Sequence, residues 1–281
     1  MTALRKYNIQ KVLNNNVLIC TFKDQEVVLI GKGIGFNKKR GMVLSDTTLI
    51  EKVYTLKTER DKAHYKALVE ITEDYIIHAI IDAVNIVKDY CDASKMNALM
   101  LSLTDHLIFA IKRIKEGQII YNPFQNEIKQ LYPDDYQIAD KFIKQLSESL
   151  YLRFPDDEIG FIALHIASNK QSESLKELSQ TNELILLCVQ IIESDFKIEV
   201  DKLGIPYHRF IRHINFLIKR LRHGDIVKKQ CEFENVLQTH YPRCYNIAVK
   251  IMKMMQQQLN VDIYEAEVMY LTLHIHNLTQ Q

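Results

Sequence analysis

Four histidines stand out because they occupy equivalent places in an internal repeat. The segment 105–113 aligns with 212–220 at an offset of 107 residues, and the segments around His165 and His274 align at an offset of 109. An imidazole can carry a proton, a metal ion or a phosphoryl group, so histidines built in twice are candidates for chemistry. Of the ten histidines, the four with a counterpart are His106, His165, His213 and His274.

Several roles for these histidines remain open. They could be half-buried structural residues, and a metal site is disfavoured because His274 and His276 form an HxH only in the second copy. Catalysis would need a cleft and a third group, so we predict no catalytic residue, metal site or cofactor. The remaining role is a switch, in which a proton or a phosphoryl group of about two negative charges alters the local charge. Seven residues from each histidine lies a charged residue on the same helix face: Arg113, Glu158, Arg220 and Glu267.

The elements that must position the histidines are helices. Helical periodicity begins near Thr58, and Gly117 and Gly224 match at the 107-residue offset, each placed to end a helix. The repeat predicts two all-α helical-bundle domains, at 60–170 and 171–281. The clearest periodic segments are 62–90, 103–116, 136–150, 158–166 and 182–193.

Residues 1–57 predict a different structure, a small antiparallel all-β module. Asn14–Asn16 and Lys23–Gln25 supply the first two turns. A module of this size buries only a modest core, so pairing with a second copy would stabilise it. The expected strands are 9–13, 17–22, 26–30 and 49–56.

The charge of this module favours a nucleic acid as its partner. Residues 1–55 hold nine Lys or Arg against four Asp or Glu, whereas the whole chain has a net charge of +1. In the glycine-rich stretch 31–41, backbone can approach a ligand closely, Lys32 can meet phosphate and Phe36 can stack on an unpaired base. A hairpin turn, a tight loop and a solvated edge are the structural alternatives for these residues.

The composition argues against export and membrane insertion. The five cysteines are scattered and form no CxxC pair, which favours a reducing compartment. The chain does not open on an apolar stretch, and its apolar runs, such as 184–189, are shorter than the roughly 20 residues that a membrane span needs. We therefore expect a cytoplasmic protein.

Three segments of the β module closely resemble the co-antiterminator RNA-binding domain of the BglG/LicT/SacY family of transcriptional antiterminators: 11–17, 31–36 and 50–54. The helical repeats resemble the two phosphotransferase-system regulation domains of that family. The resemblance covers nearly the whole chain and keeps the domain order.

The resemblance implies a homodimer that stabilises a leader-transcript RNA hairpin, so that a sugar-utilisation operon is read through. It assigns RNA contacts to Asn16, Gly31, Lys32, Phe36 and Asn37, with Lys11 beside them, and phosphorylation to the four repeated histidines. The implied phosphodonors are the phosphocarrier protein and the sugar-specific permease of the phosphotransferase system. Two alternatives from other classes are a histidine phosphorelay protein and a structural helical scaffold.

Overall fold

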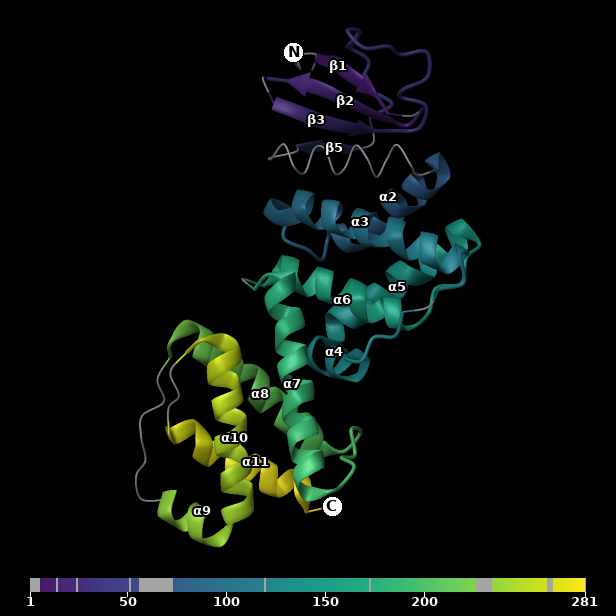
Figure 1. Cartoon of the computed structure of the whole chain (residues 1–281). Helices are drawn as coiled ribbons and strands as arrows, with labels where there is room; N and C mark the ends of the chain where they lie inside the picture. The colour runs from purple at the N-terminus through teal and green to yellow at the C-terminus, as the bar shows by residue number, and fades with distance from the viewer. Residues whose placement is uncertain are drawn as a thin grey trace. The chain divides into compact units, whose positions relative to one another are not determined.

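The computed structural model describes residues 6–13, 15–23, 25–50, 52–55, 73–118, 120–171, 173–225, 234–261 and 265–280. Figure 1 traces the chain from its purple N-terminal strands to its yellow C-terminal helices. The fold divides into two compact units, the first formed by residues 1–122 and 134–172 and the second by residues 123–133 and 173–281.

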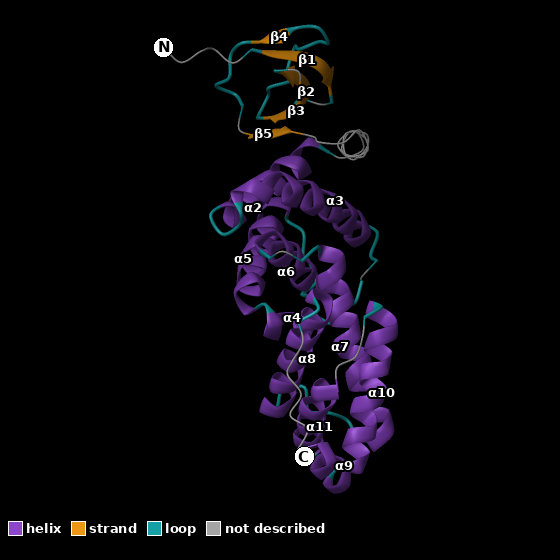
Figure 2. Cartoon of the chain, turned by 90° about the vertical axis from the view of Figure 1, so that its left-hand side faces the viewer, coloured by secondary structure: helices purple, strands orange, loops and turns teal. Residues whose placement is uncertain are grey.

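A five-stranded antiparallel sheet opens the first unit, with strand order β4-β1-β2-β3-β5. A shift in register between Ile9 and Lys11 marks a bulge in the first strand. The strands, orange in Figure 2, are β1 (Tyr7–Val12), β2 (Val17–Phe22), β3 (Gln25–Ile30), β4 (Val43–Leu44) and β5 (Lys52–Thr55).

Alternation along β2 and β3 gives the sheet two apolar faces. On one face, Leu18 and Leu29 pack with Ile34 in the core of the module. On the other face, Ile19 and Val28 pack against α2. The central strands are therefore buried on both sides, which explains their continuous apolar sequence.

The helices of the first unit follow the sheet. Within it, α3 packs against α6, which brings together segments that are some fifty residues apart in the chain. The helices are α2 (Asp74–Lys88), the short 3-10 helix η1 (Ala93–Lys95), α3 (Met96–Lys115), α5 (Pro133–Leu150) and α6 (Asp157–Lys170).

The second unit repeats this construction, with α8 packed against α11 and α10. Its core is formed by apolar side chains of α7, α8, α10 and α11, and Leu131 of α4 packs at the edge of that core. The helices are α4 (Gln125–Leu131), α7 (Leu175–Phe196), α8 (Ile205–His223), α9 (Glu234–His240), α10 (Pro242–Leu259) and α11 (Glu265–Thr279).

The predicted fold class is confirmed: a small antiparallel β module precedes two repeated helical regions. The two-residue strand β4 was not predicted, because so short a strand carries no alternation. Of the predicted turns, strands and helices, Asn14, Asp24, Glu51, Leu56 and residues 62–72 lie outside the described residues. No helix in the described ranges is long and apolar enough to cross a bilayer.

The glycines expected to end helices do so. Gly224 has φ of +72° directly after α8, and Gly117 has the same φ after α3. Apart from the adjoining residues of the chain, no atom of the described residues lies within 4 Å of where a Cβ would stand on either glycine. A substitution there would therefore act through backbone strain and not through a clash.

We predict that Gly224→Ala lowers the free energy of unfolding by about 1 kcal/mol, the cost of holding a side-chain-bearing residue in the left-handed region. Thermal unfolding followed by circular dichroism would measure this as a drop in Tm of a few degrees. Gly224→Asn, which tolerates positive φ, serves as the control and should lose less. Equal losses in both variants would contradict the strain argument.

Candidate functional site

In the first helical copy, the two repeated histidines face one another across the α3–α6 contact. The ring centroids of His106 and His165 lie 5.3 Å apart. Nε2 of His106 donates to Oε2 of Glu158 at 2.8 Å, and Arg113 donates to the other carboxylate oxygen at 3.1 Å. The two histidines that the repeat singled out therefore lie close together, and a buried carboxylate lies between an imidazole and a guanidinium.

Glu158 is ionised in this arrangement, although its side chain is only 3% exposed. Burial alone would raise the pKa of Glu158, but the hydrogen bond and charge of His106, together with Arg113, hold that pKa below its ordinary value. A carboxylate only accepts hydrogen bonds, so Nε2 of His106 carries the proton. In the neutral ring, Nδ1 of His106 then holds the free lone pair.

His165 is held in the opposite tautomer. Ser102 donates its hydroxyl proton to the Leu99 carbonyl at 3.1 Å, so the same oxygen accepts from Nδ1 of His165, also at 3.1 Å. The lone pair of His165 is therefore on Nε2. Burial, and next the charge of His106, lowers the pKa of His165 to about 3, which keeps the ring neutral.

In the second copy, His213 and His274 stack across the α8–α11 contact, with centroids 4.2 Å apart and rings 21° from parallel. Glu267, 1% exposed, is held by Arg220 through two hydrogen bonds of 2.9 Å, one to each oxygen. Both oxygens of the carboxylate are thus engaged by one guanidinium. In the first copy an imidazole bonds the buried carboxylate, whereas in the second copy the two imidazoles stack on one another.

The second pair is also kept neutral. Burial first, then the charges of His274 and Arg220, lowers the pKa of His213 to about 3. Nε2 of His213 is buried and has no hydrogen-bond partner among the described residues. Burial and the charge of Arg209 lower the pKa of His274. His276, which the sequence placed beside His274, instead packs on Tyr241 with centroids 4.1 Å apart.

Sequence spacing had put Glu158 and Glu267 two turns from His165 and His274 on their own helices, too far to touch. The structure gives these carboxylates partners on the neighbouring helix, which helical periodicity cannot reveal. Ser102 was likewise missed, because a lone serine in a helix carries no signal in the sequence.

In the β module, the asparagine turn and the glycine-rich loop lie side by side. Backbone N–H groups of Gly31 and Gly35 donate to the carbonyls of Asn16 and Asn15, at 3.0 and 2.9 Å. The side-chain Oδ1 of Asn16 accepts from the N–H of Gly33 at 2.8 Å. Asn16 is buried, so its side chain fixes the loop from within.

Of the other residues predicted to contact RNA, the loop presents Lys32, Phe36 and Asn37 at the surface. Phe36 is 65% exposed. Lys32 and Asn37 are exposed as well, and Asn37 adopts φ of +57°. Gly31 is buried, and its backbone N–H bonds the Asn16 carbonyl. The loop is held by hydrogen bonds to the asparagine turn, and the exposed ring of Phe36 suits stacking on an unpaired nucleobase.

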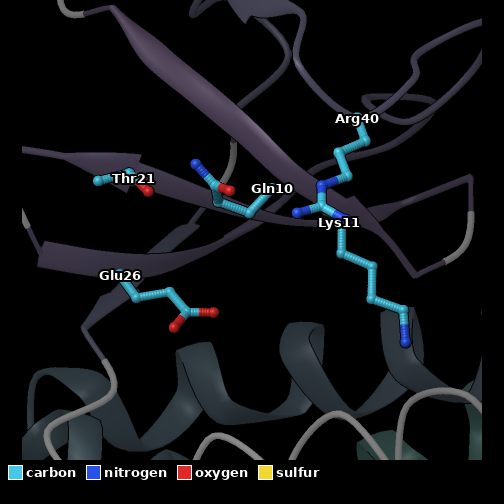
Figure 3. Close-up of a pocket in the computed structure, with 5 residues that line it drawn as sticks. All are labelled: Gln10, Lys11, Thr21, Glu26 and Arg40. Carbon is cyan, nitrogen blue, oxygen red and sulfur yellow. The ribbon is translucent and has the colours of Figure 1, made fainter.

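Lys11 lies in an open hollow of about 490 Å³ on the sheet (Figure 3). Gln10 and Arg40 line the same hollow; Arg40 belongs to the predicted stretch 31–41, whereas Gln10 was not predicted from the sequence. The bulge in β1 explains this, because the register shift leaves both Gln10 and Lys11 exposed where alternation would bury one. Thr21 and Glu26 complete the lining.

Comparison with known proteins accounts for both parts of the chain. Residues 7–63 match the CAT RNA binding domain, and residues 82–169 and 187–278 match the PRD domain. The chain belongs to the BglG/LicT family of antiterminators, which combine these domains.

Particular members are similar over almost their full length. The "GlcA/glcB genes antiterminator" of Staphylococcus carnosus (strain TM300) is 56% identical over 99% of this chain and 98% of its own. "Protein GlcT" of Staphylococcus aureus (strain Newman) is 51% identical over 98% of each chain. A solved structure, "Crystal structure of GlcT CAT-PRDI", is 40% identical with a TM-score of 0.50, covering 58% of this chain and 98% of its own.

Because the folded protein holds His165 neutral, its stability should depend on pH. The unfolded chain binds a proton at His165 near pH 6.5, whereas the folded chain does so only near pH 3. Stability is therefore retained above pH 6.5 and lost as the pH falls below it. Between pH 7 and pH 5 we expect a loss of about 2 kcal/mol from this residue.

Urea unfolding at pH 7 and pH 5 would measure the loss. His165→Gln removes the titrating group, so the difference between the two pH values should shrink by about that amount. The control is His240→Gln, at an exposed position in α9. If His165→Gln leaves the pH dependence unchanged, His165 is not the group responsible.

Proposed function

We propose that this protein binds a hairpin in the leader transcript of genes related to glcA and glcB, and that histidine phosphorylation controls readthrough. The named relatives and the paired domains support this proposal. In it, the RNA-contacting residues are Lys11, Asn16, Gly31, Lys32, Phe36 and Asn37, and Gln10 and Arg40 extend the surface around Lys11.

The single observation that carries the regulatory half is the cross-helix histidine pair, found in both helical copies beside a buried Glu–Arg ion pair. A phosphoryl group adds about two negative charges. On His106 that charge would compete with Glu158 for Arg113 and weaken the α3–α6 contact. Such a change in helix packing is a physical route from modification to domain arrangement.

The partners and setting follow from the same proposal. The phosphocarrier protein and the sugar-specific permease of the phosphotransferase system would donate phosphoryl groups to His106, His165, His213 and His274. The protein would act in the cytoplasm as a homodimer and as a regulator, not an enzyme. We place its functional domains at 1–57, 60–170 and 171–281, and coupling would run from the helical domains to the RNA face of the dimer.

We expect Phe36→Ala in the full chain to weaken binding of a partly paired RNA hairpin by about tenfold or more, because base–aromatic stacking is lost. Fluorescence anisotropy across a salt series would measure the affinity. Leu49→Ala is the matched control, since Leu49 is an exposed apolar residue of the same module at 48% exposure. Equal weakening by both variants would contradict a specific role for Phe36.

Alanine at any one of the four paired histidines should change readthrough of a terminator reporter, while the RNA affinity of the unphosphorylated chain stays within about twofold. His240→Ala, on an exposed site, should leave readthrough unchanged. Phosphoryl transfer would be followed in parallel with labelled donor. If phosphate passes from the protein to a further acceptor and readthrough is unaffected, the chain acts as a phosphorelay protein instead.

A further inference from the structure

The two histidine pairs differ at one position that the repeat makes comparable. At the 107-residue offset, Arg209 on α8 takes the place of Ser102 on α3. In the first copy this position faces the second histidine of the pair, since Ser102 bonds Nδ1 of His165 at 3.1 Å. The equivalent position in the second copy should face His274.

The geometry of α8 agrees with this placement. Arg209 lies four residues before His213, so both side chains share one helix face, and His274 stacks on His213 from α11. The charge of Arg209 acts on His274, whose pKa it helps to lower. Arg209 is exposed, and within the described ranges no ion pair joins it to an acidic residue.

Arg220, whose charge acts on His213, already has partners. Arg220 binds both oxygens of Glu267, which is 1% exposed. Moving Arg220 to a new anion would leave that buried carboxylate unpaired, which is costly. An anion on His274 would therefore be met by Arg209, without loss of the existing ion pair.

We propose that Arg209 is the phosphoryl-binding residue of His274. Its guanidinium donates to the oxygens of a phosphoryl group on that ring, a geometry that arginine suits because two parallel N–H groups match two phosphate oxygens. The inference rests on the proposed phosphorylation of His274. The first copy has Ser102 in this place, so a phosphoryl group on His165 has no such partner.

The small donor phosphoramidate tests this without a protein partner. A ring nitrogen of His274 attacks phosphorus, the N–P bond of phosphoramidate breaks, and ammonia leaves with the proton of the ring. A ³¹P NMR titration of the full chain then reports the second ionisation of the attached phosphoryl group. The resonance that disappears in His274→Ala identifies the site.

We expect Arg209→Ser to raise the phosphoryl pKa at His274 by about one unit, because a nearby cation favours the dianion. Arg209→Lys should recover part of the shift. The matched control is Arg212→Ser, which removes the same charge from the next turn of the same helix and should change the phosphoryl pKa by less than about a third as much.

Each alternative result of this titration would contradict a specific part of the proposal. Equal shifts of the phosphoryl pKa in Arg209→Ser and Arg212→Ser would mean that Arg209 acts through long-range electrostatics and not through a direct contact. No shift in Arg209→Ser would mean that Arg209 does not bind the phosphoryl group. If phosphohistidine forms at the other paired histidines but not at His274, this inference fails alone. If none of the four histidines takes a phosphoryl group from phosphoramidate or from the protein donors, the proposed function fails as well.

Discussion

The burial of Glu158 and Glu267 at the helix contacts α3–α6 and α8–α11 is the constraint on which the regulatory region depends. A carboxylate that is 3% or 1% exposed must find cations or hydrogen-bond donors, or lose stability. Each one recruits an arginine from the neighbouring helix, and this ion pair ties the two histidine-bearing helices together. The histidines meet beside it, so any change of charge on an imidazole acts directly on the contact.

The two copies meet this requirement in different ways. Glu158 shares its oxygens between His106 and Arg113, whereas Arg220 takes both oxygens of Glu267. The imidazole of the first copy is therefore part of the ion-pair network, and that of the second is stacked beside it. One duplicated fold thus provides two histidine pairs that differ in their contacts with the buried carboxylate.

The β module shows a related use of buried polar groups. Asn16 is buried because its side chain supplies an acceptor to Gly33, and the backbone of the asparagine turn receives two more N–H groups from the glycine-rich loop. These bonds satisfy the backbone N–H groups of Gly31, Gly33 and Gly35 in that loop. The loop is therefore bonded to the asparagine turn, and Phe36 in that loop stays exposed.

The sequence by itself determined the order of a β module and two helical copies, because alternation, periodicity and an internal repeat are local signals. It also singled out His106, His165, His213 and His274, since duplication marks residues independently of their contacts. Only the tertiary structure decided that Glu158 binds His106, that Ser102 fixes the tautomer of His165, and that Gln10 and Arg40 join Lys11 in one hollow. Periodicity predicts which face of a helix or strand a side chain lies on. The neighbours of that side chain depend on how the helices cross and, in β1, on the bulge in the register.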